Sequence, residues 1–172
     1  MRMAAAQSSP QEFAALVDEL AALEPERGAE GLAGEHASRR EHIERRLMYL
    51  LCADVAADER RGSIRVPTNL GVQVRTGVLA GAGKLTNVGV GGAFIQIEVP
   101  AAVGDEVSVT VERGRDSFEH TFQLRGRVAW LSAADGRRVA GFGVAFVATE
   151  GAEERRLRRL VLDLLRAYAP RP

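Results

Sequence analysis

A short basic segment holds the residues of this sequence that are best suited to bind a ligand. Arg60 and Arg61 are adjacent, and Arg65 follows soon after them. Gly62 disfavours a helix and Pro67 favours an extended chain before it, so the sequence predicts a flexible arm. A guanidinium group is always charged, offers a rigid fork of N–H donors and stacks on flat rings. The arginines therefore predict an anionic, planar ligand that accepts hydrogen bonds.

A second candidate segment, Asn87–Gly92, reads Asn-Val-Gly-Val-Gly-Gly and precedes a short apolar stretch. Gly89, Gly91 and Gly92 have no side chains, so a ligand can approach the backbone closely here. Asn87 carries an amide that both donates and accepts hydrogen bonds. We interpret the arginines and this glycine-rich turn as two sides of one binding site. The alternatives are a solvated linker with repeated arginines and a simple turn in which Asn87 has a positive φ.

The elements that must position these residues are predicted to be short strands. Apolar residues alternate with polar ones at Val72 and Val74, and again at Val107, Val109 and Val111. Glycine-containing turns separate such segments from about position 70 to 146. This pattern is typical of a small antiparallel barrel.

Single residues predict three details of the strands. The first strand is expected to begin at Leu70, where the alternation starts. Gly126 is expected to form a β-bulge within a long strand. Trp130 is expected to lie in the core, unless an edge position brings it to the ligand.

Helices are predicted on both sides of the strands. The N-terminal extension, residues 1–57, has helices at about 10–24 and 38–55, each introduced by a capping box. Residues 58–172 form the strand domain, and a helix at 152–168 closes it. The arginines of the second helix alternate with glutamates, so we interpret its polar face as solvated and locally ion-paired, not as a nucleic-acid contact.

Composition argues against several functional classes. The 23 basic and 23 acidic side chains balance, so nothing favours a nucleic-acid polymer or an acidic membrane. No apolar run is long enough for membrane insertion and no signal sequence is found, so we expect a cytoplasmic protein. The single cysteine fits a reducing compartment. The three histidines are scattered and no titratable groups converge, so we expect neither a metal site nor an enzyme.

The order and separation of the two candidate segments resemble the PilZ domain, a bacterial family that binds the second messenger cyclic di-GMP. The family's Arg-x-x-x-Arg signature matches Arg61 and Arg65. Its Asp/Asn-x-Ser-x-x-Gly signature matches Asn87 and Gly92, whereas Gly89 stands where the family has serine.

The resemblance covers residues 58–149 and continues into the segments 127–130 and 141–146. It implies a mainly β fold with helical additions: a small antiparallel six-stranded Greek-key barrel, a C-terminal helix and a two-helix N-terminal extension. It also implies a site for cyclic di-GMP. The implied site residues are Arg60, Arg61, Arg65, Asn87, Gly89, Gly91 and Gly92.

The resulting hypothesis is a non-catalytic cyclic di-GMP sensor that signals to an unidentified protein partner. The alternative is a degenerate PilZ-like adaptor that no longer binds nucleotide and acts through protein contacts, because Gly89 lacks a hydroxyl donor. The N-terminal and C-terminal helices are candidates for such contacts, including contacts between copies of the chain. No catalytic residue, metal ligand or resident cofactor is expected.

Overall fold

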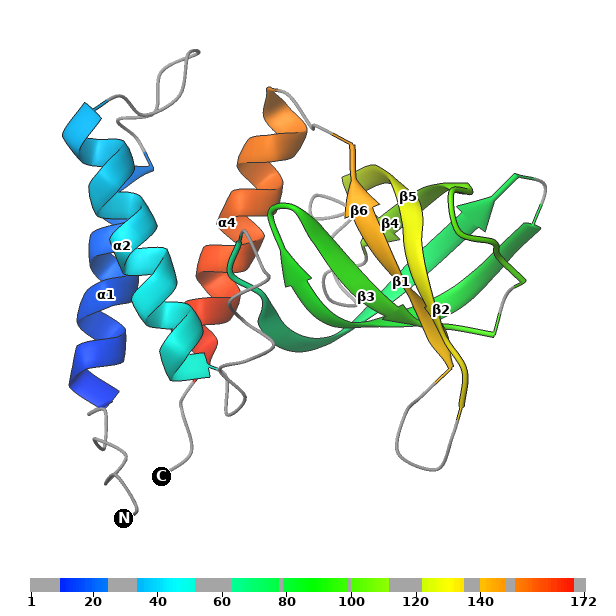
Figure 1. Ribbon diagram of the computed structural model, residues 1–172, viewed down its shortest axis with the longest axis horizontal. Helices are drawn as coiled ribbons and strands as arrows, with labels where there is room; N and C mark the ends of the chain where they lie inside the picture. The colour runs from blue at the N-terminus through cyan, green and yellow to red at the C-terminus, as the bar shows by residue number, and fades with distance from the viewer. Residues whose placement is uncertain are drawn as a thin grey trace. The chain divides into compact units, whose positions relative to one another are not determined.

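The structure is a computed structural model that describes residues 10–24, 34–51, 63–77, 79–98, 100–111, 122–134, 140–147 and 151–168. The elements, drawn in Figure 1, are α1 (Pro10–Leu23), α2 (Gly34–Leu51), β1 (Val66–Thr76), β2 (Leu79–Gly89), β3 (Gly92–Gln96), β4 (Glu106–Val111), β5 (Phe122–Ser132), β6 (Gly141–Phe146) and α4 (Ala152–Ala167). The chain divides into two compact units, each treated by itself. One is Arg65–Val161, and the other joins residues 1–64 to residues 162–172.

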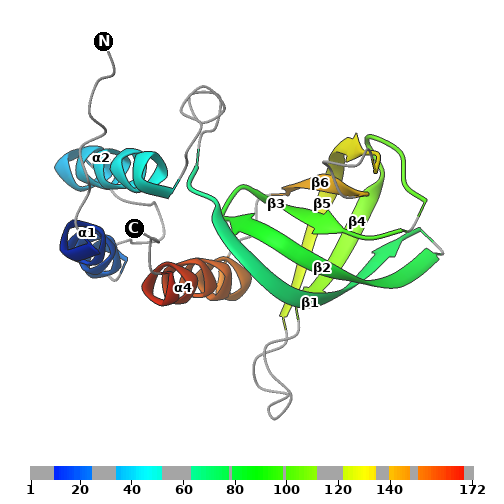
Figure 2. The same cartoon turned by 90° about the horizontal axis from the view of Figure 1, so that it is seen from below.

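The first of these units contains a closed antiparallel barrel, seen from a second side in Figure 2. The strand order is β1-β2-β3-β6-β5-β4. The strands β1-β2-β3 form one meander and β4-β5-β6 form a second. The β3–β6 and β1–β4 ladders join the two meanders and close the barrel. The six-stranded antiparallel barrel with added helices that the sequence predicts is confirmed.

The barrel interior is filled by apolar side chains that alternate along the strands. Removal of each such side chain from water contributes about 1.5–3 kcal/mol before the cost of ordering the chain is counted. The buried set comprises Val66, Val72, Val74, Leu85, Val88, Ala93, Ile95, Val107, Val109, Val111, Leu124, Val128, Phe142 and Val144.

Gly126 is needed for a close approach between strands, not for a bulge. A Cβ atom on Gly126 would lie 2.5 Å from the carbonyl oxygen of Ala145 on β6. Gly126 is in register with both neighbouring strands. The predicted bulge at this residue is therefore wrong, and the register of β5 shifts instead between Val128 and Trp130.

β1 begins at Val66, before the predicted start at Leu70. The early part includes Pro67, which pairs with Asn87 on β2. Proline has no N–H and is tolerated in a strand where one edge is unpaired. The β1–β4 ladder covers only Val72–Thr76, so the missing N–H of Pro67 interrupts no ladder on that side.

In the helical unit, α1 and α2 pack along apolar stripes and are joined by ion pairs. The nitrogen–oxygen distances are 2.6 Å for Arg46–Glu12, 2.6 Å for Arg39–Glu19 and 2.5 Å for Arg40–Glu24. The prediction of local ion pairs on α2 is therefore incomplete, because these three arginines reach glutamates of α1. The buried apolar residues of these two helices are Phe13, Val17, Leu20, Ile43 and Leu47.

The helix bounds agree with the predictions for α1 and α4 and differ for α2. α2 begins at Gly34, one turn before the predicted Ser38, because no residue between them breaks a helix. Gly34 itself has a φ of 57°, which marks the entry into the helix. The predicted end of this helix at residue 55, and the predicted domain boundary at 57/58, lie outside the described residues. None of the described helices is long and apolar enough to span a membrane.

Candidate functional site

A row of residues runs across the outer face of the barrel. Pro67 pairs with Asn87, Asn87 with Phe94, Phe94 with Gly143, and Gly143 with Trp130. Residues that pair across neighbouring strands share one face of the sheet. Pro67, Asn87, Phe94, Gly143 and Trp130 therefore form one line over five strands, which we call the outer row.

A bulge in β2 turns Asn87 outward. Leu85 pairs with Ile95 and Asn87 pairs with Phe94, so β2 has one extra residue, Thr86, relative to β3. Leu85 and Val88 are both 0% exposed, although strict alternation would place them on opposite faces. The bulge absorbs this mismatch and places the Asn87 side chain on the outer face.

Trp130 lies on the outer row and not in the core, so that prediction is wrong. The shift of register after Val128 turns its indole outward, where the residue is 44% exposed. Its ring stacks on that of Phe94, with centroids 5.0 Å apart and planes 9° apart. Gly143 makes the stack possible, because a Cβ atom there would overlap the indole nitrogen. The glycine opposite a tryptophan is the signal that sequence reasoning missed.

Arg65 and Gly92, both predicted site residues, come together at one end of this face. Arg65 is half-buried and directly precedes β1. A Cβ atom on Gly92 would lie 3.3 Å from Nη2 of Arg65 and would overlap the carbonyl oxygen of Val144. By alternation Arg65 shares the outer face with Pro67, which pairs with Asn87. Three predicted residues are thus gathered on one surface.

The side-chain oxygen of Asn87 is the most unusual atom of this surface. Oδ1 is buried, and within the described part of the chain it has no hydrogen-bond partner. A buried acceptor without a donor costs about 1–3 kcal/mol. A ligand that brings an N–H or O–H donor to this oxygen would remove that cost.

The glycines of the turn are not required by a left-handed backbone conformation. Gly89 pairs with Gly92, and Val90 and Gly91 form the turn between β2 and β3. None of the three glycines is among those with positive φ, and no described residue other than glycine has a positive φ. The interpretation of Asn87 as a turn residue with positive φ is therefore wrong, because it lies within β2.

Two of the predicted site residues, Arg60 and Arg61, lie outside the described residues. The described ranges contain no cluster of His, Cys, Asp and Glu side chains that could hold a metal ion.

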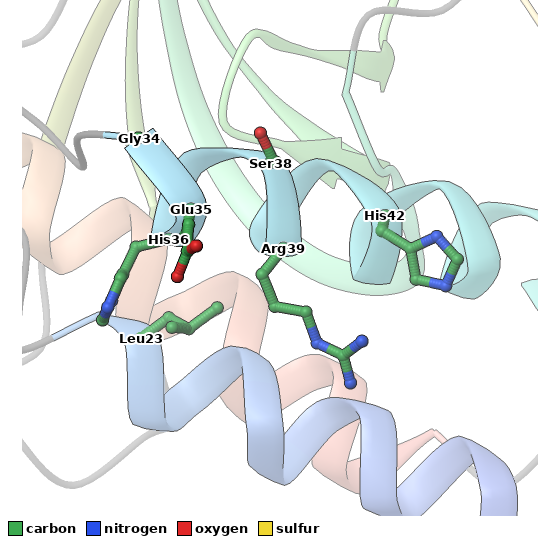
Figure 3. A pocket seen from close by; sticks show the side chains of 7 residues that line it. All are labelled: Leu23, Gly34, Glu35, His36, Ser38, Arg39 and His42. Atoms are coloured by element: carbon green, nitrogen blue, oxygen red, sulfur yellow. The ribbon is translucent and has the colours of Figure 1, made fainter.

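A separate groove of about 880 Å³ lies in the helical unit. Figure 3 shows the side chains that line it. Its lining residues are Leu23, Gly34, Glu35, His36, Ser38, Arg39 and His42. A hydrogen bond from Arg39 holds the pKa of the Glu19 carboxyl below its ordinary value, and His42 adds a smaller electrostatic effect. The groove contains none of the predicted site residues.

Comparisons with known proteins bear on the barrel. Residues 59–163 match the family model of the PilZ domain. The PilZ domain of YcgR from Escherichia coli, solved with c-di-GMP, is 19% identical over 63% of this chain and 93% of that chain, with a TM-score of 0.50. At this identity the likeness concerns the fold.

Two other solved structures are similar. The PilZ domain of CeSA from a cellulose-synthesizing bacterium is 22% identical over 59% of this chain and 98% of that chain, with a TM-score of 0.47. A tetrameric PilZ protein from Xanthomonas campestris is 18% identical over 92% of this chain and 81% of that chain, with a TM-score of 0.35. No curated protein sequence matches this chain.

Proposed function

Because the chain belongs to the PilZ domain family, we propose that it binds cyclic di-GMP on the outer row of its barrel. The observation that carries the proposal is the buried Oδ1 atom of Asn87, which lacks a hydrogen-bond partner within the described residues. Guanine has N–H donors on the edge that it would turn toward this oxygen. A bond from the ligand would replace the one that the protein itself does not supply.

The other groups on this face suit the rest of the ligand. The Arg65 guanidinium offers parallel N–H donors that fit a phosphate, or the O6 and N7 atoms of guanine. Arg60 and Arg61 precede it in the sequence and add charge for the same phosphates. Gly89, Gly91 and Gly92 leave the backbone of the turn open to the ligand. The exposed ring of Trp130 provides a flat surface on which a base can stack.

We further propose that the protein is a non-catalytic, cytoplasmic sensor that signals the presence of cyclic di-GMP to a protein partner. The helices outside the barrel are the surfaces we propose for that partner or for a second copy of the chain. The competing proposal is an adaptor that binds no nucleotide, which is favoured by the absence of a hydroxyl at Gly89. The two proposals differ in one measurable quantity, the affinity for cyclic di-GMP.

Isothermal titration calorimetry on the full chain tests the proposal. We expect wild-type protein to bind, and Arg65→Ala to weaken binding about 10- to 100-fold through loss of charge-assisted bonds. Arg75→Ala is the matched control, because Arg75 is an exposed arginine at the other end of β1. Absence of binding by folded wild-type protein at about 100 μM ligand would refute the sensor and leave the adaptor.

A further inference from the structure

Thr86 occupies the bulge in β2 directly before Asn87. It is the extra residue between the Leu85 and Asn87 positions of the β2–β3 ladder. Leu85 is fully buried in the barrel, whereas Thr86 and Asn87 are both partly exposed. The two bulge residues therefore lie side by side at the outer surface, and one of them carries the buried Oδ1 atom.

The hydroxyl of Thr86 is held only weakly by the protein. Its Oγ1 donates to the carbonyl oxygen of Phe94 across a distance of 3.5 Å. An ordinary O–H···O hydrogen bond spans about 2.5–3.0 Å, so this contact is at the outer limit. The hydroxyl can therefore turn to a better acceptor with little loss.

The turn that follows offers no hydroxyl of its own. Gly89, Gly91 and Gly92 have no side chains, and Val90 is apolar. Along β2 and its turn, Thr86 is thus the hydroxyl donor nearest to Asn87. One strand position presents a donor and the next a buried acceptor.

A donor from Thr86 beside an acceptor from Asn87 matches the edge of guanine and not that of adenine. Guanine carries the acceptor O6 beside the donor N1–H, whereas adenine carries the donor N6–H₂ beside the acceptor N1. A donor from Thr86 and an acceptor from Asn87 pair with the guanine edge, and they meet adenine with donor facing donor and acceptor facing acceptor. Unpaired buried polar groups penalise the wrong base strongly.

We propose that Thr86 is a specificity-determining residue whose hydroxyl leaves Phe94 and donates to O6 of a guanine that is held at Asn87. The inference rests on the proposed function, since it assigns a role within that binding site. It predicts that Thr86 contributes to the choice of cyclic di-GMP over cyclic di-AMP as well as to affinity.

Two substitutions separate the hydroxyl from the shape of the side chain. Thr86→Val keeps the branched shape and removes the hydroxyl, and Thr86→Ser keeps the hydroxyl. We expect Thr86→Val to bind cyclic di-GMP about 3- to 10-fold more weakly, and Thr86→Ser to bind within about twofold of wild type. The preference for cyclic di-GMP over cyclic di-AMP should fall with the affinity in Thr86→Val.

Thr110→Val is the matched control, because β4 neighbours neither β2 nor β3. Its affinity should equal that of wild type. Thermal unfolding verifies that each variant is folded, and Thr86→Ala replaces Thr86→Val if the latter does not fold.

The outcomes separate the role of Thr86 from the proposed function. If wild type binds and Thr86→Val binds equally well, the role of Thr86 is refuted and the proposed function stands. Equal losses in Thr86→Val and Thr86→Ser would also refute it, because the hydroxyl would not be the cause. If wild-type protein binds no cyclic di-GMP, the proposed function fails and the role of Thr86 fails with it.

Discussion

Replacement of Asn87 by valine should make the protein more stable and weaken its binding of cyclic di-GMP. The Oδ1 atom of Asn87 is buried without a hydrogen-bond partner in the described part of the chain, so the folded state bears its desolvation cost. Valine has no polar atom, and its branched side chain suits a strand such as β2. Asn87→Val therefore removes a destabilising group and adds a favourable one.

The expected gain is about 1–3 kcal/mol in the free energy of unfolding, the cost of an unsatisfied acceptor. For a chain of 172 residues, each kcal/mol raises Tm by about 2–4 °C. The midpoint should therefore rise by about 2–12 °C. Affinity for cyclic di-GMP should fall at least about tenfold, because a donor of the ligand would lose its acceptor.

Urea denaturation without ligand and calorimetry with ligand measure the two effects. Gln73→Val is the matched control, since Gln73 is an exposed amide on the outer face of β1. That change should alter the free energy of unfolding by less than about 0.5 kcal/mol and leave affinity unchanged. A loss of stability in Asn87→Val would show that Oδ1 has a partner in solution, and would refute the reasoning.

Two further predictions concern Trp130 and Glu19. Gly143→Ala should displace the indole of Trp130 from its place on the sheet, so the emission of this single tryptophan should shift; an unchanged spectrum would contradict the stack. The Glu19 carboxyl should titrate below its ordinary pKa, because Arg39 donates a hydrogen bond to it. Its contribution to stability is therefore present above the ordinary carboxyl pKa and is lost as the pH falls through the lowered pKa. In Arg39→Gln, NMR titration should find the Glu19 pKa raised toward its ordinary value. An unchanged Glu19 pKa in that variant would count against the ion pair.

The strands could be predicted because burial imposes a period of two on the sequence. In β4, Val107, Val109 and Val111 alternate with polar residues, and all three valines are buried. The same rule fails at a bulge, where one extra residue moves the side chains of all later residues in the strand to the opposite face of the sheet. The alternation therefore predicts Trp130 in the core, because nothing in its own segment marks the shift after Val128.

The candidate site could be predicted only as far as single segments allow. The segments around Arg65 and Asn87 were found from their own residue types. The outer row was not, because it depends on which strands are neighbours and on their register. Gly143 and Phe94 acquire their roles only through pairing across β3, β6 and β5. The ion pairs from α2 to α1 were missed for the same reason.

The five strands of the outer row also determine when a binding surface first exists during synthesis and folding. The row includes Gly143, and its strand β6 closes the barrel against β3, whose residues precede it by a long stretch of chain. A nascent chain that has not yet released β6 from the ribosome has no complete row, and loop closure of this length is slow. A ligand that contacts the complete row would bind only closed barrels, and at one hundred times its dissociation constant it would stabilise them by about 2.7 kcal/mol.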